Sequence, residues 1–343
     1  MMKINKKRLI SHEIVHFYNS LSGDYIASTG NAFEFSLNNQ IVNFKIRNTN
    51  PFIKFRILRR LFRLDKSNAF FNFNKTLIIV LYQGTIFNFS IKNKALRSIS
   101  KLRQCRCVLH NSIAITKNCI VFGEYGRNPS GEDVPLWVSR DDGKSFEVLN
   151  KIKDIKHIHG AYKDPYTNSI WVTTGDHDGE CFLIEFLNED FLNPKFYGDG
   201  SQQWRTVSLM FRKDKIFWIM DSPNAVPKLQ ILDRSTLRIS QGMSFDAPVW
   251  YTKRLSDNSY LAQTSIEPGN AVKSKHSKIF YSSDLINWHQ IASFKKDLLP
   301  KILFKFGVVF FSEGHQTKDD FIISGEALLG LDGRSWNCSI KES

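Results

Sequence analysis

Five acidic side chains follow strongly apolar segments at similar intervals along the chain. Each segment ends abruptly in an acid, and successive acids lie 52, 45, 46 and 59 residues apart. The five acids are Glu124, Asp176, Asp221, Glu267 and Glu326. Glycoside hydrolysis requires two carboxyl groups roughly 5–10 Å apart, one as acid and one as base or nucleophile. The candidate catalytic residues are therefore Asp176, Asp221, Glu124 and Glu267.

A second set of side chains has the chemistry needed to hold a sugar. Carboxylates and amides bind hydroxyl groups, and aromatic faces pack on the C–H side of the ring. The candidate substrate-binding residues are Arg205, Arg127, Gln203, Trp204, Tyr251, His159, Asp178 and Glu326. His110 and Trp250 also stand near the start of apolar segments that we interpret as strands.

The densest group of carboxylates lies in the segment 176–180, Asp-His-Asp-Gly-Glu. One of its carboxyls could act as a general acid, with its pKa raised by neighbouring like charges. The same segment could instead bind Ca²⁺ or Mn²⁺, although its spacing is not that of an EF-hand, or form an acidic hairpin turn. We assign no metal ligand and no cofactor, and leave a divalent cation open.

His157 and His159 alternate along an apolar segment. Alternate residues of a strand point to the same face, so both rings could reach one ligand. A lyase base or a metal site, with His110 as a third ligand, would use that arrangement. The other interpretation is a hydrogen-bonding scaffold without chemistry.

The elements that position these residues repeat. Segments rich in aromatic and β-branched residues alternate with Asn, Asp, Gly and Pro, and the acid-ended segment recurs every 45–59 residues. A period of this size with several strands is typical of propeller blades. We expect an all-β fold, a single β-propeller domain over 1–343 with four-stranded antiparallel blades. Its blades are degenerate over 11–103 and regular over 105–343.

Seven blades of this period account for the length of the chain, and six would also fit. If the acid-ended segments are the second strands of their blades, the five acids lie at equivalent ends of five blades. The carboxylates would then surround one mouth of the propeller.

Residues 139–146, Ser-Arg-Asp-Asp-Gly-Lys-Ser-Phe, match the Asp-box pattern at every defined position. The Asp can accept backbone N–H bonds within a tight turn, and Gly143 can adopt positive φ. Residues 282–288 form a shortened copy without the Gly, and 332–336 keep the second half. The chain thus resembles the BNR/Asp-box propellers of the sialidase superfamily. Residues 105–343 also look like glycosyl hydrolases of bacterial surface-polysaccharide clusters.

The resemblance implies that the Asp boxes are structural and lie at the outer edge of the blades. It also implies a retaining mechanism with a Tyr nucleophile, a Glu partner, an Asp acid and three Arg. Tyr125 stands beside Glu124, and Arg127 and Arg205 match two members of the arginine set. No third Arg is evident, so activity on sialic acid is not expected.

Positive charge is concentrated in the first third of the chain. Residues 1–120 hold 20 Lys and Arg against four acids, whereas the whole chain has a net charge of +14. In the segment 53–64, apolar and basic residues alternate with the period of an amphipathic helix, which could lie on an anionic membrane surface. A blade strand with exposed Arg is the alternative. No nucleic-acid-binding motif is present, and we expect no nucleic-acid partner.

The five cysteines have neither disulfide nor zinc-like spacing, and we interpret them as free thiols. The N-terminus shows no apolar signal segment, and no window is apolar enough to span a membrane. The expected location is cytoplasmic, with attachment to the inner membrane left open.

These observations favour a glycosidase-like, carbohydrate-active enzyme that acts on a bacterial surface-type glycan. The alternative is a non-catalytic propeller that binds a glycan or a protein. A glycosyltransferase or polysaccharide lyase of polysaccharide assembly is a third hypothesis.

Overall fold

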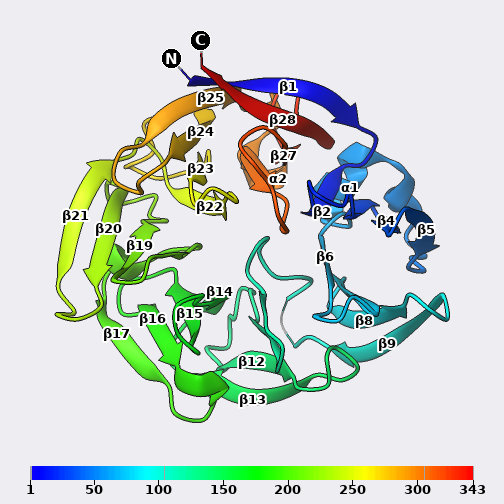
Figure 1. Cartoon of the computed structure of the whole chain (residues 1–343), viewed down its shortest axis with the longest axis horizontal. Coiled ribbons are helices and arrows are strands. Elements are labelled where there is room, and N and C mark those ends of the chain that lie inside the picture. Colours follow the sequence, from blue (N-terminus) through cyan, green and yellow to red (C-terminus); the bar gives the residue numbers. More distant parts are fainter. Residues whose placement is uncertain (1, 104, 305, 343) are drawn as a thin grey trace. The chain divides into compact units, whose positions relative to one another are not determined.

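The computed structural model describes residues 2–103, 105–304 and 306–342, and its strands form seven four-stranded antiparallel sheets (Figure 1). The chain is a seven-bladed β-propeller, as the repeat period predicted. In chain order the first three sheets are β2 (Ile14–Tyr18), β3 (Tyr25–Thr29), β4 (Ala32–Leu37), β5 (Gln40–Lys45); β6 (Ser67–Phe71), β7 (Leu77–Tyr82), β8 (Thr85–Ser90), β9 (Ala95–Lys101); and β10 (Ala114–Ile115), β11 (Ile120–Gly123), β12 (Val134–Ser139), β13 (Glu147–Ile152).

The other four sheets follow the same order of strands. They are β14 (His157–Lys163), β15 (Ile170–Gly175), β16 (Cys181–Phe186), β17 (Lys195–Gly200); β18 (Met210–Phe211), β19 (Lys215–Ile219), β20 (Lys228–Asp233), β21 (Ile239–Ser244); β22 (Val249–Arg254), β23 (Tyr260–Thr264), β24 (His276–Ser282), β25 (His289–Lys295); and β26 (Val308–Phe311), β27 (Phe321–Glu326), β28 (Arg334–Glu342), β1 (Met2–Ile10).

The last sheet joins the two ends of the chain. β1 lies at its edge and pairs antiparallel with β28, from Met2 opposite Glu342 to Ile10 opposite Ser335. The N- and C-terminal ends therefore lie side by side in Figure 1. The fourth strand of the seventh blade thus comes from residues that precede the first blade.

The apolar segments recognised in the sequence are the inner strands of the sheets. Every residue of β15 and of β27 is buried, whereas most residues of the edge strands β5 and β21 are exposed. A strand covered on both faces loses the alternation of apolar and polar residues that a half-exposed strand keeps. For this reason the second strands read as continuous apolar runs.

The chain forms two compact units. Unit 1 comprises Met1–Asp65, Ser222–Leu229 and Gly242–Ser343, and unit 2 comprises Lys66–Asp221 and Gln230–Gln241. Within unit 2, apolar side chains such as Val121, Ile158 and Val172 form a core between the sheets β10–β13 and β14–β17. The prediction of a single domain over 1–343 stays a prediction.

The motif at residues 139–146 forms the tight turn between β12 and β13. Asp141 Oδ1 accepts hydrogen bonds from Ser139 Oγ at 2.8 Å and from the backbone N–H of Ser145 at 2.9 Å. Gly143 has φ of +88°, and its N–H donates to Ser139 Oγ at 2.8 Å. The turn is structural, as the motif predicted.

The two partial copies differ from each other. In 282–288 the same turn joins β24 to β25, and Leu285 adopts the positive φ of 69° without a glycine. Residues 332–336 instead begin in the loop between β27 and β28, the second and third strands of their sheet, and continue into β28. They therefore do not form the turn that 139–146 and 282–288 form.

The basic segment forms η1 (Pro51–Lys54) and α1 (Arg56–Phe62), so the prediction of a helix is correct for α1. The alternative, a blade strand with exposed Arg, was wrong for this segment. Arg59 and Arg60 are buried, and Arg60 Nη1 lies 2.7 Å from Asp297 Oδ2. Arg59 pairs with Glu13. The arginines face the core of unit 1, and apolar side chains of the segment face outward.

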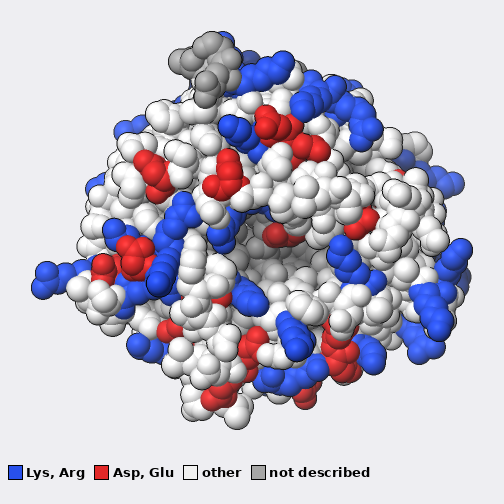
Figure 2. All heavy atoms as spheres, in the orientation of Figure 1, with Lys and Arg blue, Asp and Glu red and all other residues white. Residues whose placement is uncertain are grey.

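Figure 2 shows Lys and Arg side chains dispersed among uncharged and acidic residues on one face, without a continuous basic patch. All five cysteines are free thiols. No helix among the described residues has both the length and the apolar character needed to span a bilayer.

Candidate functional site

A β-bulge in unit 2 brings two histidine rings together. The pairing of β14 with β15 shifts register between Ile158 and Gly160, which makes His159 the extra residue of β14. A bulge re-aims the side chain that it carries. The Nε2 atoms of His157 and His159 lie 3.1 Å apart as a result.

The same irregularity recurs in the first strands of two sheets of unit 1, where His16 and Trp250 are the extra residues. Trp250 Nε1 donates to Glu267 Oε1 at 3.0 Å. In unit 2, His159 contacts Asp176 in the same way. In these last two sheets the bulge in the first strand directs a side chain toward the acid that follows the second strand, whereas His16 Nε2 lies 2.8 Å from Ser28 Oγ.

Asp176, directly after β15, is the centre of the cluster. Its Oδ1 lies 3.3 Å from Nε2 of both His157 and His159 and 3.0 Å from Arg205 Nη2. Its Oδ2 lies 2.8 Å from Lys156 Nζ. His157 and His159 are almost completely buried, whereas the Asp176 side chain is 19% exposed.

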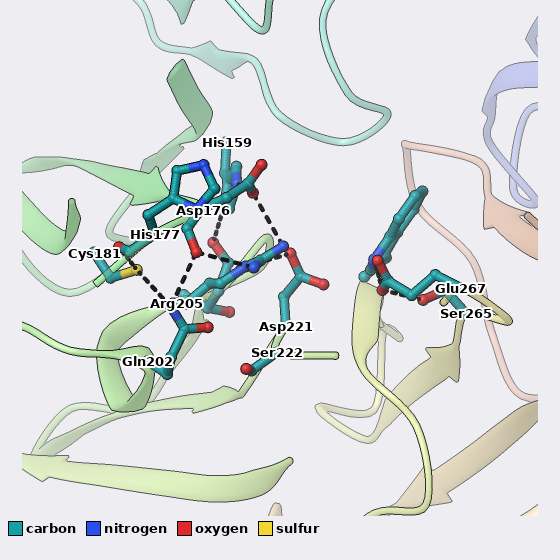
Figure 3. A network of polar contacts seen from close by, with 12 residues as sticks. His159, Asp176, His177, Cys181, Gln202, Arg205, Asp221, Ser222, Ser265 and Glu267 are labelled. Carbon is teal, nitrogen blue, oxygen red and sulfur yellow. Dashed lines mark hydrogen bonds and ion pairs between the residues drawn. The ribbon is translucent and has the colours of Figure 1, made fainter. Parts of the chain in front are cut away.

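Arg205 links two of the predicted carboxylates. Figure 3 shows its guanidinium between Asp176 and Asp221, with Nε 3.4 Å from Asp221 Oδ2. The carbonyl oxygen of Asp176 also accepts hydrogen bonds from Arg205 Nη1 at 3.0 Å and from Gln202 Nε2 at 2.9 Å. Asp176, Asp221 and Arg205 were candidate site residues from the sequence, and the structure brings these three side chains together in unit 2.

Glu180 shapes the loop that presents Asp176. Its Oε2 accepts hydrogen bonds from the backbone N–H groups of Asp176 at 2.9 Å and His177 at 3.0 Å. His177 and Asp178 are exposed at the tip of this loop. The segment 176–180 is therefore a turn that Glu180 closes.

The electrostatics of the cluster oppose the role of general acid proposed for Asp176. Burial by itself raises the pKa of the Asp176 carboxyl, but its close contacts with His157 and His159 outweigh burial and hold the pKa far below its ordinary range. Burial lowers the pKa of His159, although the hydrogen bond with Asp176 acts in the opposite direction. The expectation of a raised carboxyl pKa in this loop was wrong for Asp176.

Two other candidate catalytic carboxylates hold structural hydrogen bonds. Glu124 Oε1 accepts from Trp137 Nε1 at 2.9 Å and from the backbone N–H of Arg103 at 2.8 Å, both within unit 2. Glu267 Oε1, in unit 1, accepts from Trp250 and from Ser265 Oγ. Both carboxylates are buried.

The predicted substrate-binding residues lie in several different environments. Trp204 stacks on Trp218 with ring centroids 5.4 Å apart, and Tyr251 is buried beside Phe310. Tyr251 packs within the protein, so its expected place on a sugar-binding surface was wrong. Trp204 is half-buried, and its role in binding a sugar stays a prediction. The carbonyl of Gln203 accepts a hydrogen bond from Trp218 Nε1.

Arg127 is exposed, whereas Glu326 is buried at the end of β27. Among the described residues, the group with metal-ligand geometry is His157, His159 and Asp176. Asp176 therefore takes the place that the sequence hypothesis gave to His110.

Sequence reasoning missed Lys156 and Gln202. Lys156 directly precedes the His157/His159 pair, and Gln202 is the neighbour of the predicted Gln203. The 3₁₀ helix η3 (Gln202–Trp204) determines which of the two amides faces Asp176. No pattern in the sequence shows the direction in which this short helix turns its side chains.

No protein-family model matches the chain, and no curated protein matches it. Among solved structures, the WD40 β-propeller domain of Doa1 matches with a TM-score of 0.59 at 10% identity, over 99% of this chain and 97% of that chain. A chain of the Mitotic Checkpoint Complex matches with a TM-score of 0.60 at 8% identity, over 99% and 95%.

The Kuenenia stuttgartiensis hydrazine synthase matches less closely, with a TM-score of 0.50 at 7% identity over 80% of this chain and 78% of that chain. At these identities the likenesses establish the fold alone. The first match is a WD40 propeller domain, and nothing in the comparisons supports a relationship to sialidases or glycosidases.

Proposed function

We propose that this chain is a non-catalytic binding propeller that recognises a protein partner. The glycosidase hypothesis needs a carboxyl group that is protonated and available to a leaving group. A binding propeller needs only a rigid frame and exposed loops that differ from blade to blade.

One observation carries the proposal: the candidate catalytic carboxylates are occupied by groups of the protein itself. Glu124 and Glu267 accept hydrogen bonds from indole N–H groups, and Asp176 is paired with Lys156 and Arg205. Asp221 faces the same arginine. Carboxylates held in this way stabilise loops, which suits positioning rather than proton donation.

The loops that follow the second strands in unit 2 are the proposed contact surface. Arg127, His177 and Asp178 are exposed there, on segments anchored by the buried polar cluster. Solved propellers of the same fold include a chain of the Mitotic Checkpoint Complex, a multi-protein assembly. That likeness supports protein recognition as the general class of function.

The test compares capture of partners with turnover of glycans. Cross-linking and mass spectrometry on the purified protein in cell extract should identify a partner that Asp178→Arg loses by about 10-fold or more. The matched control is Asp214→Arg, an exposed acid in the turn between β18 and β19 at the other end of the strands, which should retain the partner. A surface-type glycan that wild type cleaves and Asp176→Asn does not would overturn the proposal.

Attachment to an anionic membrane surface is a second candidate function, favoured by an exposed apolar surface in unit 1. The apolar surface consists of Phe52, Phe55, Ile57, Phe62, Leu298, Ile302 and Leu303. These residues belong to η1, α1 and the segment around α2 (Lys301–Phe304), and α1 contacts α2. Ile302 is 89% exposed.

Basic side chains accompany this apolar surface. Lys54 and Arg63 are exposed within the same segment, and aromatic and aliphatic side chains beside Lys and Arg are typical of interfacial membrane binding. We infer an anionic lipid surface as the occupant.

Sedimentation with phosphatidylcholine vesicles, with and without phosphatidylserine, tests this inference. The double variant Phe55→Glu/Ile302→Glu should bind anionic vesicles about 10-fold or more weakly than wild type. The control is Leu192→Glu, which changes an exposed leucine of unit 2 and should bind like wild type. Equal sedimentation of wild type and the double variant would contradict membrane attachment.

A further inference from the structure

We propose that unit 2 binds one divalent first-row transition-metal ion between His157 Nε2, His159 Nε2 and Asp176 Oδ1. Zn²⁺ is the probe ion of the proposed experiments. The three atoms form a compact triangle with edges of 3.1, 3.3 and 3.3 Å. This inference does not depend on the proposed binding function, because it concerns the ion and not the partner.

The hydrogen bonds of the two rings determine where their protons lie. His157 Nδ1 is 2.8 Å from the carbonyl oxygen of Gly126, and His159 Nδ1 is 2.9 Å from that of Thr206. A carbonyl oxygen only accepts, so each Nδ1 carries the hydrogen and donates it. In the neutral rings, both Nε2 atoms therefore present lone pairs.

These lone pairs point toward each other and toward a carboxylate oxygen. Three acceptors at 3.1–3.3 Å cannot hydrogen-bond to one another without a positive charge between them. Either a proton or a metal ion can supply that charge. Nδ1–H groups held by backbone carbonyls are the usual arrangement behind metal-binding histidines, because they fix the tautomer and the ring orientation.

The size of the triangle fits a metal ion. Ligand atoms about 2.0–2.1 Å from a tetrahedral Zn²⁺ lie about 3.3–3.4 Å from each other. The edges of the triangle are within about 0.3 Å of that separation. Two imidazoles and one carboxylate leave at least one coordination position open, and this ligand set suits first-row transition metals better than Ca²⁺ or Mg²⁺.

The surrounding charges permit a divalent cation. Lys156 and Arg205 contact Asp176, and each would repel an ion. The carboxylates of Asp176, Asp221 and Glu180 outnumber these two cations. Arg205 and Lys156 also hold the carboxylate in place, which is the role of outer-shell groups in metal sites.

Metal content and affinity of the untagged protein test the proposal. Protein stripped with EDTA and dialysed against Zn²⁺ should retain one ion per chain by elemental mass spectrometry. Titration calorimetry of the stripped protein should give the Zn²⁺ affinity, and Co²⁺ should give the intense visible absorption of a tetrahedral site. His157→Ala and His159→Ala should each lower the Zn²⁺ affinity by at least about 100-fold.

The matched control is His177→Ala, which removes an exposed imidazole next to Asp176 and should bind Zn²⁺ like wild type. Circular dichroism of each stripped variant shows whether it folds. If the alanine variants do not fold, His159→Gln and Zn²⁺-dependent protection of the wild-type β14 amides from hydrogen exchange decide the question.

The proposal would be overturned if the wild-type protein took up no stoichiometric Zn²⁺. The positive charge between the two rings would then come from a shared proton. Equal Zn²⁺ affinity of wild type and His157→Ala would also overturn it. Neither result bears on capture of a protein partner, so the two proposals fail independently.

Discussion

The imidazole of His159 packs directly against Gly175, the last residue of β15. A Cβ atom at position 175 would lie 2.8 Å from Cε1 of this ring and 3.4 Å from Cγ of Arg205. Real Cβ atoms do not approach so closely, so glycine is required for His159 to reach Asp176. The small residue that precedes the acid in the sequence is thus part of the cluster.

Gly175→Ala should therefore displace His159 and lower the free energy of unfolding by about 1–3 kcal/mol. Urea denaturation measures the change. In a His159→Ala background the ring is absent, and the same substitution should cost less than about 1 kcal/mol. An equal loss of unfolding free energy in the two backgrounds would show that the contact with His159 is not the reason why position 175 requires glycine.

Glu124 should behave as a structural acceptor. Glu124→Gln keeps the oxygen that accepts from Trp137 and Arg103, and should change the free energy of unfolding by less than about 1 kcal/mol. Glu124→Leu removes the acceptor of the buried Trp137 indole N–H and of the Arg103 backbone N–H, and should cost about 2–5 kcal/mol. Thermal and urea unfolding measure the stability of both variants. Equal stability of Glu124→Gln and Glu124→Leu would contradict the role of Glu124 as a structural acceptor.

Arg60 should stabilise unit 1 far more than the exposed Lys54 of the same segment. Its guanidinium is buried and lies 2.7 Å from Asp297 and 3.3 Å from Asp332. Arg60→Met leaves these carboxylates without the cation and should cost about 3–5 kcal/mol. Lys54→Gln, at an exposed position, should stay within about 0.5 kcal/mol of wild type in urea unfolding. A similar loss of unfolding free energy in Arg60→Met and Lys54→Gln would contradict a stabilising role for the ion pairs of Arg60.

Asp284 should make the stability of the turn between β24 and β25 depend on pH. Burial raises its pKa, but hydrogen bonds from Asn287, Ile286 and Ser282 together outweigh burial and lower the pKa to about 2, from an ordinary value of 3.8. Because the folded state depresses this pKa, the charge stabilises the fold above about pH 4, and the stabilisation disappears as the pH falls toward about 2.

Asp284→Asn keeps an oxygen acceptor and removes the charge. It should be less stable than wild type at about pH 7, and the difference in urea unfolding free energy should shrink below about pH 4. A difference that stays constant with pH would show that the charge of Asp284 does not contribute.

Local patterns in the sequence were sufficient for the fold. The repeated apolar segments predicted the inner strands and the number of blades, because a strand buried on both faces must be apolar throughout. The motif at 139–146 predicted its turn, because its hydrogen bonds join residues within the motif. The pairing of β1 with β28 had no such local signal, since it joins residues more than 300 positions apart.

The sequence by itself determined the propeller, the position of the five acids at or just beyond the ends of the second strands, and the alternation of His157 with His159. Only the tertiary structure decided what those side chains do, because their partners come from other strands and loops. Trp137 holds Glu124, and Arg205 joins Asp176 to Asp221. A single-residue bulge in β14 aims His159 at Asp176, and such a bulge depends on strand pairing that residue types do not encode locally.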